Sequence, residues 1–383
     1  MNLNFWPKMY GYGGGGSGGG GAGGGGAAGA GGGTGGAGGG AAGELPPEEL
    51  TPAGAFRFNT DTAKLEYYDG NQWVNVTTDS PEQNTGGTRG LMVAGGYPVV
   101  ADIQILNLAT TGNAVDSGND FASNRYLSGA TSDRTRGVYF GGYGTTAEIR
   151  FNDIATASST SDFGDLSAGR WAVAGASDGV RGLALGGTAG PSTINAGINE
   201  IEYVTIQATG NAVDFGDLIK ELAGCSSCNS PTRAITFGGI EDSPNSATTD
   251  IEYVTMSTLG NASDFGDLSG NLQDTGSGGG GNAIRGITNV GDAYSNVLEF
   301  ITIATLGNSQ DFGDDVMSRG GGVHCMSSPT RLVIAGGNQP SDSETNTIAY
   351  VQIMSTGNAI DFGDLINSKK SGYSVSNGHG GLG

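Results

Sequence analysis

Residues 161–166 read SDFGDL, and the chain repeats this stretch with small changes along its length. The later copies are VDFGDL at 213–218, SDFGDL at 263–268, QDFGDD at 310–315 and IDFGDL at 360–365. A short aromatic motif that recurs at intervals of this size is typical of proteins built from repeated structural units. The repetition therefore decides the fold.

The DFG core is also found in kinases, where the aspartate holds magnesium against ATP. A kinase has one such motif, together with a glycine-rich phosphate loop, a strand lysine and an HRD loop. This chain has several copies and none of those partner motifs. The motif therefore does not indicate a kinase.

The composition limits the classes of partner. The chain has 383 residues, 75 of them glycine, and a formal net charge of −21. This acidity repels phosphate backbones and anionic lipid. No apolar run approaches the roughly 20 residues that span a bilayer, and the N-terminus lacks the basic start and apolar core of a secretory signal. We therefore expect no nucleic acid partner and no membrane insertion.

Cysteine and histidine are scarce. Three cysteines are too few for a disulfide framework. Cys225 and Cys228 form a CxxC pair, but residues three apart in an extended segment point to opposite sides of a strand. We expect small, partly buried side chains; a redox or zinc pair is the alternative. Two histidines, His324 and His379, cannot build a histidine-rich metal centre, so we expect no metal and no cofactor.

Four segments precede the repeats. Residues 1–10 form an aromatic peptide with Phe5, Trp6 and Tyr10, and residues 11–52 are a Gly/Ala-rich leash and linker. A flexible leash with an apolar tip indicates an anchor, with a tail of no function as the alternative. Residues 53–78 alternate apolar and polar positions around two turns, which predicts a small three-stranded β-meander that oligomerises or packs on a neighbour. Residues 79–87 are a linker.

Residues 88–383 divide into six equivalent units of about fifty residues. Each unit opens with an arginine that starts an apolar strand, then continues with a second strand, the DFGDL strand and a polar fourth segment. Four strands per unit around a double glycine are typical of a propeller blade. The arginines are Arg89, Arg136, Arg181, Arg233, Arg285 and Arg331.

The units resemble kelch repeats, in which one strand ends in Gly-Gly and a later strand carries an aromatic residue and a leucine. Double glycines stand at 95–96, 141–142, 186–187, 238–239 and 336–337, and FGDL supplies the aromatic residue and the leucine. The fifth unit has Val290-Gly291 instead, and the first has DSGND in place of FGDL. The resemblance implies an all-β fold with a six-bladed, kelch-like β-propeller over residues 88–383.

The C-terminal stretch KSGYSVSNGHGGLG is an extra copy of the fourth segment, whereas the first unit begins directly at its Gly-Gly strand. We expect these two parts to meet, so that the C-terminal strand completes the first blade. A closed ring would leave no exposed sheet edges.

The repeated side chains are expected to be structural. The phenylalanines of the motif would wedge between neighbouring blades; they are Phe163, Phe215, Phe265, Phe312 and Phe362. We also expect each arginine to pair with the first aspartate of a DFGD motif, for example Arg233 with Asp214 or Asp264. A calcium ion held by the DFGD carboxylates is the alternative.

The loops between the first and second strands vary, whereas the SPTR and TGNA turns at the opposite end repeat. Variation on one side of a rigid scaffold indicates a binding face. Tyr97, Tyr143 and Tyr294 lie in these loops as candidate contacts for a sugar or a protein, with plain packing as the alternative. The copper ligands of kelch-type galactose oxidases and the Asp boxes of sialidases are missing, so we expect no catalytic residues and no enzyme.

Residues 55–76, AFRFNTDTAKLEYYDGNQWVNV, resemble a short module of structural and tail-fibre-like proteins of tailed phages, especially those of marine and cyanobacterial hosts. The match includes Arg57, Asn59, Thr60, Asp61, Thr62, Lys64, Leu65, Glu66, Tyr68, Gly70 and Trp73. The resemblance implies a virion protein, assembled in the host cytoplasm and exposed on the particle, whose N-terminus joins other virion proteins. The expected role is tail-fibre-like recognition of a host surface glycan or protein by a homo-oligomer. The alternative is a purely structural nozzle, adaptor or capsid-decorating protein.

Overall fold

A computed structural model of the chain describes residues 52–59, 64–75, 87–96, 100–122, 127, 129–190, 194, 196–242, 245–272, 278–290, 294–340 and 343–382. The chain forms two compact units, Met1–Ser80 and Pro81–Gly383. Antiparallel strands make up nearly all of the secondary structure, so the expected all-β class is confirmed. Within the described ranges, no helix is long and apolar enough to cross a membrane.

The described part of the first unit is a three-stranded antiparallel sheet of β1 (Phe56–Asn59), β2 (Lys64–Tyr68) and β3 (Trp73–Asn75). Arg57 donates from Nε to Oε2 of Glu66 at 2.6 Å, and its guanidinium lies 4.2 Å from the ring centroid of Trp73. Phe56 and Tyr67 face each other across the strand pair with ring centroids 5.5 Å apart. Among the described residues, both of these rings are exposed.

The second unit contains six groups of four antiparallel strands, and each group has the same order across the sheet: first strand, arginine strand, third strand, fourth strand. Group 1 is β28 (Tyr373–Ser376), β4 (Arg89–Val93), β5 (Asp102–Asn107) and β6 (Val115–Asp120). Group 2 is β7 (Ala130–Ser132), β8 (Arg136–Phe140), β9 (Glu148–Asp153) and β10 (Ser161–Asp165). Group 3 is β11 (Ala174–Ser177), β12 (Arg181–Leu185), β13 (Ile198–Thr205) and β14 (Val213–Ala223).

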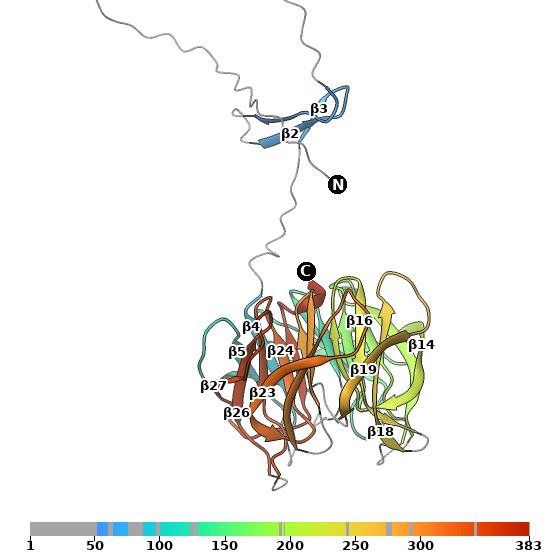
Figure 1. The fold of residues 1–383 in the computed structure, drawn as a ribbon, viewed down its shortest axis with the longest axis vertical. Helices are drawn as coiled ribbons and strands as arrows, with labels where there is room; N and C mark the ends of the chain where they lie inside the picture. The colour runs from blue at the N-terminus through green and yellow to red at the C-terminus, as the bar shows by residue number, and fades with distance from the viewer. Residues whose placement is uncertain are drawn as a thin grey trace, which may run out of the picture. The chain divides into compact units, whose positions relative to one another are not determined.

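Group 4 is β15 (Ser226–Asn229), β16 (Arg233–Phe237), β18 (Ser246–Thr255) and β19 (Ser263–Leu272). Group 5 is β20 (Gly279–Gly281), β21 (Arg285–Val290), β22 (Ser295–Thr302) and β23 (Gln310–Arg319). Group 6 is β24 (His324–Ser327), β25 (Arg331–Ala335), β26 (Thr347–Gln352) and β27 (Ile360–Asp364). The short 3-10 turn η2 (Gly380–Leu382) ends the described chain at one end of this unit (Figure 1).

Groups 3 and 4 are joined into one nine-stranded sheet by the two-residue strand β17 (Ile240–Glu241). Strand β17 pairs with the end of β14 and also with the start of β18. The loop after the arginine strand of group 4 therefore crosses to the fourth strand of group 3, which the sequence pattern did not predict.

The C-terminal strand completes the first group, as expected. Strand β28 pairs antiparallel with β4, with Tyr373 opposite Val93 and Ser376 opposite Gly90. The sheets are thus offset from the sequence units by one strand, because the segment that ends one unit pairs with the arginine strand of the next.

The first strands of the six groups contact one another in sequence. Strand β28 contacts β7 and β24, and further contacts join β7 to β11, β11 to β15, β15 to β20 and β20 to β24. Serine hydroxyls link these strands: Ser132 donates to Ser376 O at 2.8 Å, and Ser177 donates to Ser132 O at 2.6 Å. Six hydrophobic cores lie between the groups, and each combines side chains of two neighbours.

Candidate functional site

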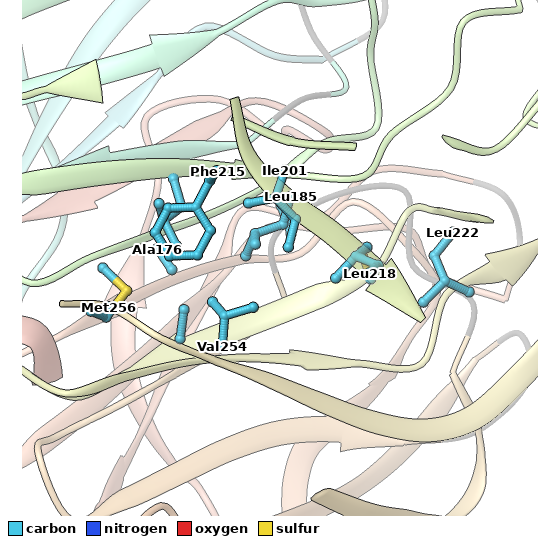
Figure 2. Packing of buried hydrophobic residues seen from close by; sticks show 12 residues of the cluster. Ala176, Leu185, Ile201, Phe215, Leu218, Leu222, Val254 and Met256 are labelled. Carbon is cyan, nitrogen blue, oxygen red and sulfur yellow. The ribbon is translucent and has the colours of Figure 1, made fainter. Parts of the chain in front are cut away.

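The phenylalanine of each DFGD motif is the extra residue of a β-bulge. In group 3, Ile201 pairs with Gly216 and Glu202 pairs with Asp214, so Phe215 has no partner on the third strand. A bulge re-aims the side chain of its extra residue. The ring of Phe215 is 2% exposed and lies with Leu185 in a core that also contains Met256 of group 4 (Figure 2). The same bulge recurs at Phe163, Phe265, Phe312 and Phe362.

The glycine of the motif receives the turn of the next group. The Gly260 N–H donates to Phe215 O at 2.8 Å, and the Asp217 N–H donates to Asn261 Oδ1 at 3.2 Å. A Cβ on Gly216 would lie 2.5 Å from the carbonyl oxygen of Gly260. The same approach occurs at Gly164, Gly266, Gly313 and Gly363. The DFGD motif of one group and the Gly-Asn turn of the next group, such as Gly260-Asn261, therefore contact each other.

Replacing Gly216 with Ala is expected to lower the free energy of unfolding by about 3 kcal/mol, because the new Cβ meets backbone at a φ of +146°. Gly260→Ala is the matched control. Its φ of +148° is similar, but nothing lies within 4 Å of the new Cβ, so a cost of about 1 kcal/mol is expected. Chemical denaturation of both variants measures the difference, and equal losses would contradict a role for the close approach.

The predicted ion pair between Arg233 and Asp214 or Asp264 is wrong. The Arg233 guanidinium lies 4.6 Å from the ring centroid of Tyr253, and its Nη1 donates to Ile303 O of group 5 at 2.7 Å. Both aspartates are exposed, so water already solvates their charges and an ion pair there would add little stability.

Every arginine of the set reaches the next group in the same way. The acceptors of Arg136, Arg181 and Arg285 are the carbonyl oxygens of Ile206, Met256 and Ile353, at 3.0, 2.9 and 3.3 Å. Arg89 donates to Ala155 O of group 2, and Arg331 of group 6 donates to Ala109 O of group 1 at 2.7 Å. The last contact returns to the group that began the series.

The connections between strands lie at two opposite ends of the second unit, which we call the turn face and the loop face. The turn face carries the turns between first and arginine strands and between third and fourth strands, and the loop face carries the loops between arginine and third strands. Tyr143 and Tyr294 lie on the loop face. The Tyr143 ring is 38% exposed and packs edge-on against Trp171 at 5.3 Å, whereas Tyr294 packs against Gly320 in group 5. Tyr97 and the candidate anchor residues Phe5, Trp6 and Tyr10 lie outside the described residues.

Both histidines of the chain hold its C-terminal segment, which the sequence did not predict. The His379 ring contacts Ser132 O at 2.8 Å through Nε2 and Asn229 Nδ2 at 3.1 Å through Nδ1, so it joins groups 2 and 4. His324 accepts the Gly372 N–H at 3.2 Å through Nε2. Burial lowers the pKa of His379 to about 4 and that of His324 to about 3, so both rings are neutral at pH 7.

Acid is expected to loosen this segment. The folded-state pKa of His379 lies below its ordinary value of 6.5, so the unfolded chain binds the proton more tightly. The contribution of His379 is therefore complete above pH 6.5 and falls by about 3 kcal/mol as the pH drops to about 4. Burial raises the pKa of Glu252 to about 7, so protonation of Glu252 stabilises the folded state as the pH falls and opposes the effect of His379.

The readout is therefore the difference between the wild type and His379→Asn in free energy of unfolding, measured from pH 4 to 8. We expect the difference to shrink as the pH falls. A constant difference would show that His379 does not titrate on unfolding.

The three cysteines are buried and none forms a disulfide, and the CxxC pair is split between two cores, with Cys225 in the core of groups 3 and 4 and Cys228 in the core of groups 4 and 5. Burial raises the pKa of Cys225 to about 12, so its thiol is protonated at pH 7. Among the residues with described positions, no three His, Cys, Asp or Glu side chains are grouped closely enough to hold a metal ion. No protein-family model matches the sequence, and the search of curated proteins gives no match either.

Proposed function

We propose that the second unit is a six-bladed β-propeller in which each four-stranded group is one blade. The proposal is supported by three series of contacts that run through all six groups and return to their starting point. These are the contacts between first strands, the cores shared by neighbouring groups and the arginine-to-carbonyl hydrogen bonds. Strand β28 takes part in the first-strand contacts and in the core of groups 1 and 2, which supports a ring closed by the C-terminal strand.

We propose that this propeller is a rigid, non-enzymatic scaffold that presents its loop face for binding. One observation carries the proposal: β4, the strand that follows the N-terminal part of the chain, begins at Arg89 on the turn face. A protein tethered through its N-terminal part would therefore present the opposite end, where the loops vary in length and sequence. Variable loops on a rigid scaffold suit recognition of diverse partners.

The biological setting follows from the resemblance of residues 55–76 to phage tail-fibre-like proteins. We propose a virion protein, anchored to other virion proteins through its N-terminus and exposed on the particle as a homo-oligomer. Its loop face would bind a host surface glycan or protein. The net charge of −21 favours a neutral or basic partner surface over an anionic one.

A purely structural role as a nozzle, adaptor or capsid-decorating protein is the second candidate, and one observation favours it. The turn face carries exposed apolar side chains, including Leu259 (57% exposed), Ile284 (52%) and Leu306 (57%). Apolar side chains exposed at one end of a molecule are typical of a protein contact. That contact would lie on the turn face, so it does not compete with a free loop face.

The test is a cryo-EM reconstruction of the particle that carries this protein, followed by an adsorption assay with the purified full chain as competitor. A loop face exposed to solvent, together with reduced adsorption, is the expected result. A loop face buried against other virion proteins would overturn the recognition role and leave the structural one.

A further inference from the structure

The turns on the turn face differ between the groups at one exposed position. The residue before the glycine of the turn between third and fourth strands is threonine in groups 1, 3 and 6, but leucine in groups 4 and 5. These residues are Thr111, Thr209, Thr356, Leu259 and Leu306. All five are exposed, and each leucine is 57% exposed. Because threonine serves the same turn in other groups, the fold does not require leucine there.

Two further positions of these turns carry large exposed apolar side chains. The residue before the arginine strand is threonine in groups 1, 2, 4 and 6, but Val180 in group 3 and Ile284 in group 5. Ile284 is 52% exposed. The second residue after the third strand is alanine, glutamine or serine in groups 1 to 5, but Met354 in group 6, where it is 50% exposed. We call the side chains of groups 4 to 6 the apolar sector: Leu259, Ile284, Leu306 and Met354.

Hydrogen bonds tie the turns of the apolar sector to one another. The Arg233 guanidinium of group 4 donates to Ile303 O of group 5 at 2.7 Å, and Arg285 of group 5 donates to Ile353 O of group 6 at 3.3 Å. Ile303 and Ile353 begin the turns of groups 5 and 6. The Ile303 N–H also donates to Ile284 O at 2.9 Å. The apolar sector therefore lies on neighbouring turns that are held in place.

The exposed charges beside the apolar sector are negative. Each fourth strand of groups 4 to 6 starts one residue before an exposed aspartate; these are Asp264, Asp311 and Asp361. The arginines of the same groups are half-buried, and each guanidinium lies over an aromatic ring. A partner for this surface should therefore be apolar and carry positive charge. A second turn face would bring the same aspartates, so direct contact between two turn faces is disfavoured.

The chain contains a segment with the matching chemistry. Residues 1–10 include Phe5, Trp6 and Tyr10, and Lys8 is the one charged side chain of residues 1–43. Aromatic residues and methionine are enriched at protein interfaces, where tryptophan and tyrosine contribute most to affinity. The chain between this segment and the described strands can reach on the order of 100 Å when it is extended. That length is enough to reach a second copy.

We propose that the apolar sector is a docking site for residues 1–10 of a second copy of this chain. Phe5 and Trp6 would cover the two leucines, and Lys8 would meet the aspartates. Exchange of a segment between identical copies is a low-cost route to association. The inference rests on the homo-oligomer proposed above, and it names the surface and the segment that hold the copies together.

The test measures binding of a labelled peptide of residues 1–12 to the full chain by fluorescence anisotropy. The protein carries Phe5→Ser and Trp6→Ser, so that its own segment does not compete. Adding Leu259→Thr and Leu306→Thr installs the residue of the other groups, so the melting temperature should not change, whereas peptide affinity should fall about tenfold or more. Val316→Thr is the control: it makes a similar change at a 42% exposed position of β23 and should not alter binding.

Sedimentation equilibrium of the full chain tests whether the segment docks between copies. The oligomer should dissociate about tenfold more readily with Leu259→Thr and Leu306→Thr than in the wild type. No peptide binding would overturn the docking site. Peptide binding that needs both leucines, together with an unchanged oligomer, would mean that the segment docks within one chain and would overturn the second copy as occupant. A full chain that is monomeric at every concentration would overturn the homo-oligomer itself.

Discussion

Removing residues 371–383 is expected to abolish cooperative unfolding of the second unit. The deletion takes away strand β28, which supplies the only first strand of group 1 and contacts the first strands of groups 2 and 6. Tyr373 (0% exposed) and Val375 (4% exposed) leave the core shared by groups 1 and 2. Together with the exposed edge of β4, the loss is on the order of 5–10 kcal/mol, which is comparable to the whole stability of a domain.

A shorter deletion and a peptide make this prediction specific. Removing only residues 378–383 keeps β28 but removes the contacts of His379, so a loss of about 2–3 kcal/mol is expected. A synthetic peptide of residues 370–382 should restore the melting transition of the longer deletion when it is added in excess, whereas a scrambled peptide should not. Calorimetry measures both effects, and a sharp transition in the 371–383 deletion without peptide would contradict closure by β28.

Repetition explains what the sequence could predict. The five copies of DFGD indicate that Phe215 and its counterparts pack in equivalent positions. The extra copy of the fourth segment at the C-terminus indicates that β28 pairs with β4. The acceptor of Arg233 could not be found in this way, because the Ile303 carbonyl is a backbone atom that every residue type carries. The exposed aspartates carry the opposite charge, but the half-buried Tyr253 ring and a backbone carbonyl hold the guanidinium instead.

Single departures from the repeat were the hardest features to interpret. Asn289 is the fifth residue of its arginine strand, where the other groups have an apolar residue. This departure is recognised only when the pairing of Asn289 with Leu298 fixes the register. Strand β17 has two residues, too few for any periodic signal. Tyr294 was a candidate from its loop alone, but its positive φ and its packing against Gly320 depend on backbone geometry that composition does not encode.

Replacing Arg170 with Met is expected to cost about 3–5 kcal/mol, although no ligand is involved. Arg170 and Glu202 join groups 2 and 3 through a hydrogen bond of 2.6 Å from Nη2 to Oε2, and each side chain is only 1% exposed. Oε1 of Glu202 accepts the Ser167 N–H at 2.9 Å. Without the guanidinium, the Glu202 carboxylate would be a buried charge with one partner, and uncompensated buried charge is among the largest single costs in a protein core.

Glu252 shows what happens to a buried carboxyl group without an arginine partner. Glu252 occupies the position of Glu202 in group 4 and accepts the Ile219 N–H at 2.8 Å, but among the described residues it has no ion pair with an arginine. Burial raises its pKa to about 7. Arg170→Met would leave Glu202 as a buried carboxylate without its guanidinium partner, so its negative charge should become more destabilising as the pH rises.

The Arg170→Met variant should therefore be closest to the wild type in acid and lose stability steadily toward neutral pH. Adding Glu202→Gln to Arg170→Met removes the charge, so the double variant should recover at least half of the loss at pH 7 and show no such added pH dependence. Thermal unfolding of the wild type, both single variants and the double variant at pH 5 and 7.5 completes the cycle. A loss in Arg170→Met that is the same at both pH values would mean that packing of the long side chain, and not compensation of the Glu202 charge, is what Arg170 contributes.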